Sequence, residues 1–195
     1  MATAFADITF TPSVKATQTQ YGSRESNSRF ELATNPRNQL TVQEVEFIAQ
    51  RDSFYQATVS ESGWPYVQHR GGATGFLKVL DARTVGFADF RGNLQYLSVG
   101  NLQANNRISL ILMDYVNRQR LKIWGTVRIV HVDTEPQLLA QLEDSTYRAR
   151  VERGIIIHIE ALDWNCPQHI TPRYSQAQVE KMIAPLLAEI ERLKM

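Results

Sequence analysis

Segments with the composition of β-strands, separated by turns, occupy most of the chain between residues 53 and 165. They are rich in β-branched and aromatic residues, and most are joined by too few residues for the crossover that parallel strands need. This pattern constrains the fold most strongly, because it favours antiparallel pairing between neighbours in the sequence. We expect strands at residues 53–59, 66–70, 75–80, 85–90, 107–115, 121–132 and 154–165.

Helices are expected to be fewer than strands. The first begins with Thr41 and Glu44, whose spacing is typical of a capping box. The last is amphipathic and contains Pro185, a residue type that kinks helices. We expect helices at residues 41–52, 94–105, 134–152 and 175–195. Together these elements predict a mainly β (α+β) fold, an antiparallel barrel with peripheral helices.

The chain has 195 residues, enough for one domain with a sizeable core and an appendage. Residues 1–38 are rich in Ser, Thr, Asn and Gln, and we expect an extended arm that is partly disordered or lies over a partner. The sequence therefore divides into a polar N-terminal arm at 1–38, a barrel domain at 39–172 and a C-terminal helix at 173–195.

Composition argues against several functional classes. The formal net charge is +1, so no overall field attracts nucleic acid or a membrane surface. No apolar run is long enough to span a bilayer, and the N-terminus lacks the apolar core of a signal peptide. The single cysteine, Cys166, excludes an internal disulfide, and the four histidines lack the spacing of a metal site. We expect a cytoplasmic protein that holds no metal.

The segment HRGGATGFLKVLD, residues 69–81, joins a basic glycine-rich stretch directly to a β-type stretch. Glycine loops that bind phosphate in dinucleotide-binding and P-loop proteins lie between a strand and a helix. No helix is expected after this loop, so that interpretation fails. Two alternatives remain open: a barrel rim where Arg70 and backbone N–H groups meet an anion, or a glycine bend at a barrel corner, which the pattern alone favours.

An ordered series of motifs in this part of the chain resembles the FMN-binding split barrels related to pyridoxamine 5'-phosphate oxidase. The series comprises Gly-x-Pro at 63–65, Lys-x-x-Asp at 78–81, Phe-Ala-Asp-Phe at 87–90, NLQANNRISLIL at 101–112 and Trp-Gly at 124–125. The resemblance spans roughly residues 40–132, and DWNCPQH at 163–169 extends it.

The family's fold is a six-stranded split barrel that dimerises, with FMN at the dimer interface. The resemblance therefore implies a six-stranded antiparallel split β-barrel, a homodimer, FMN as the cofactor and an oxidoreductase acting on a small molecule. We expect FMN rather than FAD, because the chain carries no dinucleotide fingerprint. The resemblance assigns no catalytic residue.

The glycine-rich segment carries the first group of implied flavin-binding positions. Lys78 falls where the oxidases have a lysine on the cofactor strand, and Arg70 stands in for the arginine that begins that strand in the oxidases. A guanidinium is a suitable partner for the FMN phosphate, and glycines would let the backbone come close to the ligand. The positions implied on this segment are Arg70, Gly71, Gly72, Phe76, Leu77 and Lys78.

A second group follows along the chain. Asp89 falls where the next strand of the family meets the edge of the isoalloxazine ring, and Asn93 is a further polar candidate there. The phosphate-binding Ser-Arg-Lys of the family is replaced by Tyr-Leu-Ser at residues 96–98, so that Ser98 and Asn101 remain as polar candidates. Arg120 matches a family glutamine that reaches the flavin from across the barrel.

The partner subunit of the family dimer contributes a tryptophan and an arginine, which Trp164 and Arg173 roughly match. The oxidases also carry a C-terminal Arg-x-His motif for the substrate phosphate, whereas this chain has CPQHITPR at residues 166–173. His169 and Arg173 are of the same residue types as the motif but have a different spacing, so oxidation of pyridoxamine 5'-phosphate is disfavoured. A non-enzymatic flavin-binding protein, a related barrel using haem or deazaflavin, and an interaction module stay open as alternatives.

Overall fold

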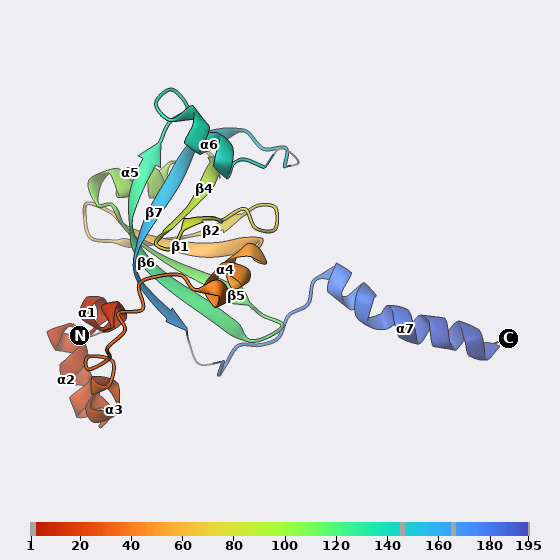
Figure 1. The fold of residues 1–195 in the computed structure, drawn as a ribbon, viewed down its shortest axis with the longest axis horizontal. Coiled ribbons are helices and arrows are strands. Elements are labelled where there is room, and N and C mark those ends of the chain that lie inside the picture. Colours follow the sequence, from red (N-terminus) through yellow and green to blue (C-terminus); the bar gives the residue numbers. More distant parts are fainter. Residues whose placement is uncertain (1–2, 145–146, 165–166, 195) are drawn as a thin grey trace.

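The computed structural model describes residues 3–144, 147–164 and 167–194. Its centre is one curved antiparallel sheet in the strand order β2-β1-β5-β6-β7-β4-β3 (Figure 1). The strands are β1 Ser53–Val59, β2 Pro65–Gly71, β3 Lys78–Asp81, β4 Thr84–Phe90, β5 Arg107–Asp114, β6 Gln119–Val130 and β7 Val151–Trp164. The predicted antiparallel, mainly β class with peripheral helices is confirmed, although the sheet has seven strands where the family resemblance implied six.

The sheet curls around a core built by alternation along each strand. In β5, Ile108, Leu110 and Leu112 face inwards and are at most 4% exposed. Strand β7 is apolar on both faces, because Ile155 and Ile157 enter the same core while Ile156 packs in a second cluster with side chains of α6 (Pro136–Leu142). Each fully buried aliphatic side chain of this kind stabilises the fold by about 1.5–3 kcal/mol.

The predicted helices are present, with one large change in length. Helix α4 (Val42–Ala49) begins with the predicted capping box of Thr41 and Glu44, and α5 (Leu97–Ala104) crosses the sheet near β1 and β2. Helix α6 ends at Leu142, although helical spacing continues to residue 152. The ladder between β7 and β4 begins at Val151, so the last two residues of the expected helix lie in a strand instead.

The glycine-rich segment forms less strand than expected. Residues 72–77 are a loop, and β3 begins only at Lys78. The loop is tied to the chain before β1, because the N–H of Gly72 donates to the carbonyl of Asp52 (2.9 Å) and that of Gly75 to the carbonyl of Arg51 (2.8 Å). Gly75 has φ of +76°, a backbone conformation that glycine adopts without strain, and it turns the chain within this loop.

The prediction of an extended N-terminal arm is wrong, because this part is helical. It contains α1 (Ala4–Thr9), α2 (Pro12–Gln20) and α3 (Arg24–Ser28). Its polar residues act partly as helix caps: Thr3 accepts from the N–H of Ala6, and Thr11 from that of Val14. Phe5 packs against Trp124 of β6, with ring centroids 5.4 Å apart, so α1 rests on the barrel.

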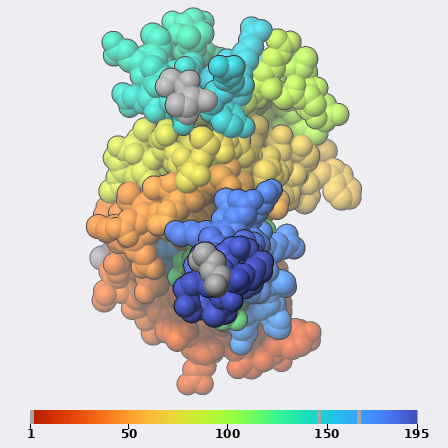
Figure 2. All heavy atoms as spheres, turned by 90° about the vertical axis from the view of Figure 1, so that its right-hand side faces the viewer, coloured from red at the N-terminus to blue at the C-terminus, as the bar shows by residue number. Residues whose placement is uncertain are grey.

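Helix α7 (Gln176–Lys194) projects away from the barrel at the C-terminal end of the chain (Figure 1). In the perpendicular view, it points out of the face turned to the viewer (Figure 2). Among the residues that the structure describes, no helix combines the length and the apolarity that a membrane span requires.

Candidate functional site

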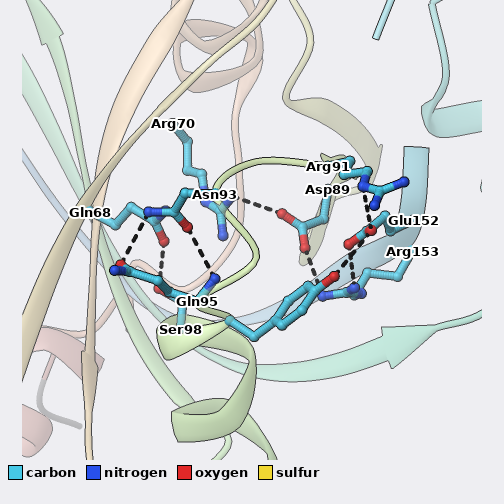
Figure 3. Close-up of polar contacts among 10 residues, drawn as sticks. Gln68, Arg70, Asp89, Arg91, Asn93, Gln95, Ser98, Glu152 and Arg153 are labelled. Atoms are coloured by element: carbon cyan, nitrogen blue, oxygen red, sulfur yellow. Dashed lines mark hydrogen bonds and ion pairs between the residues drawn. The ribbon is translucent and has the colours of Figure 1, made fainter. Parts of the chain in front are cut away.

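A pocket with mostly polar side chains lies where β2, the end of β4, the following loop and the start of α5 meet (Figure 3). Its volume is about 250 Å³, and we call it the polar pocket. Alternation along β2 places Gln68 and Arg70 on the same face of the strand, and both line this pocket.

Charged groups from three segments form one network at the pocket. Arg70 Nη1 lies 2.7 Å from Asp89 Oδ1, and Arg153 Nη1 lies 3.3 Å from Asp89 Oδ2. Arg153 also contacts Glu152 (2.7 Å), and Arg91 Nε lies 3.9 Å from the same glutamate. Burial raises the pKa of Asp89 above its usual value. The positive charges of Arg70 and Arg153 lower this pKa, but by less than burial raises it. Three arginines against two carboxylates leave this network with a net positive charge.

The first turn of α5 faces the polar pocket without a side-chain cap. The residue before the helix, Tyr96, is in the left-handed region (φ 53°), and its side chain makes no capping hydrogen bond. The backbone N–H groups that a helix leaves unpaired at its start attract anions. Leu94 in the preceding loop is also left-handed (φ 64°), and strained backbone of this kind clusters at ligand sites.

Hydrogen bonds hold the polar side chains of the pocket in place. Ser98 Oγ lies 2.8 Å from Gln68 Oε1, so the hydroxyl donates to the amide oxygen across the pocket. Asn93 and Gln95 bond to each other through both side chain and backbone, each at 3.1 Å. The Ser98 hydrogen is already engaged by Gln68, so the donors that the pocket offers a phosphate are the guanidinium of Arg70, side-chain amides and the N–H groups at the start of α5.

Four of the sequence-predicted site residues come together here. Arg70, Asp89, Asn93 and Ser98 all line the polar pocket, although they lie on different elements. Their proximity is a property of the fold, while their contact with a cofactor stays a prediction.

The other residues predicted on the glycine-rich segment lie outside the pocket. Phe76 and Leu77 are core residues, 5% and 2% exposed, and the Phe76 ring stacks on that of Phe54 at 5.4 Å. A Cβ on Gly72 would lie 2.8 Å from Cγ of Phe76, so the packing of the chain on itself requires this glycine. A Cβ on Gly71 would lie 3.2 Å from Cε1 of His69. A valine at position 72 would therefore have to displace the ring of Phe76.

Three further predicted residues also lie apart from the pocket. Lys78 begins β3 and pairs with Gly86. Asn101 lies one helical turn beyond Ser98, but its amide donates to Thr58 Oγ1 of β1 (3.0 Å). Arg120 lies near the start of β6, outside the lining of the polar pocket.

The two residues assigned to a partner subunit lie near α4 and at the tip of the β5–β6 hairpin. Trp164 donates from Nε1 to Glu44 Oε1 (2.6 Å), and its ring meets that of Phe47 at 4.8 Å. Arg173 lies 5.0 Å from the ring centroid of Tyr115. Neither lines the polar pocket of its own chain. Cys166 lies outside the described residues.

Sequence reasoning missed several members of the site. Gln68 could have been found from its place two residues before Arg70 on one strand face. Glu152 and Arg153 could not, because the sequence predicts a helix up to residue 152 and the contact of Arg153 with Asp89 spans more than sixty positions. Only the pairing of β4 with β7 brings them to the pocket.

Comparison with known proteins assigns the fold to a family. The family described as pyridoxamine 5'-phosphate oxidase matches residues 40–161, more than half of the chain. The chain belongs to this family. The match includes every residue that lines the polar pocket. No match was found among curated proteins.

Two solved structures share the fold. HupZ from Group A Streptococcus is 17% identical, with a TM-score of 0.52, and the alignment covers 69% of this chain and 100% of that one. A putative pyridoxamine 5'-phosphate oxidase from Lactobacillus delbrueckii is 19% identical, with a TM-score of 0.50, covering 65% of this chain and 94% of that one. Both alignments take in nearly the whole of the other protein, so the family domain is present as a unit.

Proposed function

We propose that the protein binds FMN and that the polar pocket holds the phosphate end of the cofactor. The observation that carries this proposal is the convergence of Arg70, the side-chain amide of Gln68 and the uncapped start of α5 on one pocket. A phosphate with nearly two negative charges needs such donors, and a guanidinium provides a planar pair of them. The resemblance to FMN-binding split barrels, in line with the family match, is the reason we propose FMN as the ligand.

Arg70 has donor capacity that the described chain does not use. The ion pair with Asp89 engages Nη1 of Arg70, and its Nε–H has no hydrogen-bond acceptor within the described residues. The fold therefore leaves part of this buried guanidinium unused. Tyr66, Phe90 and Leu97 add apolar and aromatic surface at the same pocket, as a ribityl chain and ring edge would require. The residues present fit the phosphate end of FMN.

The proposal includes a homodimer with flavin at its interface. A cavity of about 250 Å³ lies below the roughly 300–1,000 Å³ typical of pockets that enclose a whole ligand, so one protomer forms part of the site. The outer face of the β1–β2 hairpin carries exposed apolar residues, including Val67 (62%) and, at its turn, Trp64 (76%). Such a face suits a partner subunit. In this arrangement Trp164 and Arg173 serve the site of the other protomer.

The proposed activity is oxidoreduction of a small molecule. When bound, FMN supplies the electron transfer, and the residues of the chain bind and orient it. Asp89 holds Arg70 at the pocket and is itself held by Arg153 from β7, which keeps the Arg70 guanidinium beside the phosphate position. The spacing of His169 and Arg173 departs from the oxidase motif, so we propose a substrate other than pyridoxamine 5'-phosphate.

Absorbance of the purified protein tests the proposal directly. A yellow protein whose heat-released cofactor elutes as FMN supports it, and a cofactor that elutes as FAD, deazaflavin or haem refutes the FMN assignment. Oxidation of a nicotinamide donor by the holoprotein would separate an enzyme from a flavin-storing protein. A monomer mass by light scattering with FMN bound would refute the shared site.

A further inference from the structure

Helix α7 presents an apolar stripe that nothing in the described chain covers. None of its residues is buried, and it projects from the barrel in both views (Figures 1 and 2). The stripe consists of Val179, Ile183, Leu186, Ile190 and Leu193, which are 41–69% exposed. A solitary helix gains no packing energy, and the interior Pro185 costs it about 3 kcal/mol. The helix therefore needs a partner to be stable.

The spacing of the stripe identifies the kind of partner. Its residues follow one another at intervals of four, three, four and three, which is the a and d pattern of a heptad. Ile183 and Ile190 fall at a positions, while Leu186 and Leu193 fall at d positions. β-branched residues at a with leucine at d favour a parallel coiled coil of two helices. Pro185 falls at position c, outside the seam.

The charges beside the seam agree with a parallel pair. Glu189 falls at a g position and Lys194 at the following e position, so each glutamate faces a lysine of the other helix in a parallel coil. Within one helix, Glu189 and Lys194 on the flanks of the stripe already contact Arg192 and Glu191, which lie on the outer face. In the preceding heptad Met182 and Leu187 hold the g and e positions and widen the apolar seam.

The same charges argue against a membrane as the partner. Helices that lie on anionic lipid carry a polar face rich in Lys and Arg. In α7 three acidic residues are matched by three basic ones, so the polar face has no net charge. These residues are Glu180, Lys181, Glu189, Glu191, Arg192 and Lys194.

We propose that α7 pairs with α7 of a second copy of this chain as a parallel, in-register two-stranded coiled coil. Such a pair has its two-fold axis along the helices, so it is compatible with a symmetric dimer of the barrels. The segment 167–175 between β7 and α7 contains no helix or strand and is largely exposed, which allows the helix to align with that axis. This inference does not depend on the ligand of the polar pocket.

Cysteine cross-linking in the full chain tests the pairing. In a background with Cys166→Ser, Leu193→Cys places two thiols face to face at a d position, within the Cα spacing of about 4.4–6.8 Å that a disulfide spans. Arg192→Cys is the matched control, because it is adjacent, similarly exposed and on the outer face. We expect disulfide-linked dimers about tenfold faster for Leu193→Cys than for the control.

Equal rates at the two positions would overturn the proposal. A mixture of Val179→Cys and Leu193→Cys chains that links mainly between the two positions would also overturn it, because that pattern indicates antiparallel helices. Flotation of the parent protein with vesicles of anionic phospholipid, lost in Ile190→Lys, would assign the stripe to a membrane instead. FMN content measured on the same samples keeps these outcomes separate from the proposed cofactor site.

Charge reversal provides a second test that leaves the apolar seam intact. Glu189→Lys or Lys194→Glu alone should slow cross-linking at position 193 by about twofold, and the double reversal should restore it. If the double reversal is as slow as either single change, the flanking charges do not face each other and the parallel register is wrong.

Discussion

Replacing Arg70 by alanine is the sharpest test of the polar pocket. The side chain is 17% exposed, and its Nη1 lies 2.7 Å from Asp89. Removing one charge-assisted contact to a phosphate costs about 1.5–3 kcal/mol, which is roughly a ten- to hundredfold loss of FMN affinity. The loss should fall towards the upper end, because the Asp89 carboxylate near the phosphate position would keep only Arg153 as an ionic partner.

The variant also disturbs the fold, and this effect can be separated. Breaking a buried ion pair is strongly destabilising, although Arg153 at 3.3 Å still partly compensates Asp89. A second variant, Arg70→Ala with Asp89→Asn, removes the unpaired carboxylate and should recover stability without recovering affinity. Arg83→Ala is the matched control, because Arg83 pairs with Glu160 and the carbonyl of Ile159 and does not line the pocket.

The assay is titration of the apoprotein with FMN, followed by flavin fluorescence, together with thermal denaturation of each variant. We expect weak binding in both variants that lack Arg70, and parental affinity in Arg83→Ala. If Arg70→Ala binds FMN as tightly as the parent, the arginine serves only to neutralise Asp89. The phosphate would then have to lie elsewhere.

Three further predictions concern the fold and the assembly. Gly72→Val should destabilise the protein by about 1–3 kcal/mol, because the valine side chain would overlap Phe76. Gly92→Ala is the control, because the space around Gly92 is open, and it should leave the melting temperature unchanged. Equal melting temperatures for the two variants would contradict the packing argument. Burial raises the pKa of Glu44, but its hydrogen bonds, including the one from Trp164, outweigh burial and hold this pKa below 4.5. The stabilisation that the ionised Glu44 gives to the fold is therefore present above pH 4.5 and is lost as the pH falls. Glu44→Gln should lower the free energy of unfolding near neutral pH and make it less dependent on acid pH, and an unaltered pH profile would rule this out. Light scattering should give a dimer mass for the full chain, and a concentration-independent monomer would refute the shared flavin site.

Local sequence patterns determined the parts of the fold that depend on neighbours in the chain. Alternation marked β5, and the spacing of Thr41 and Glu44 marked the start of α4, since both signals act within a few residues. The proximity of Arg70 and Asp89 does not follow from such local signals. Their strands, β2 and β4, do not pair, because β1, β5, β6 and β7 lie between them in the sheet order, and only the curl of the sheet brings the two side chains together.

Tertiary structure decided the rest, because the deciding contacts are distant in sequence. The sequence suggested that Gly72 lets a ligand approach the backbone, whereas in the structure it makes space for the ring of Phe76 in the same loop. The position of that ring is set by its stacking on Phe54, which the sequence does not reveal. Arg153 reaches Asp89 because β7 pairs with β4, a ladder between segments more than sixty residues apart. The exposed stripe of α7 is visible in the sequence, but the sequence alone does not reveal that the barrel leaves it uncovered. Burial and ion pairing are properties of surfaces brought together by folding, so they follow from the assembled sheet and not from any one segment.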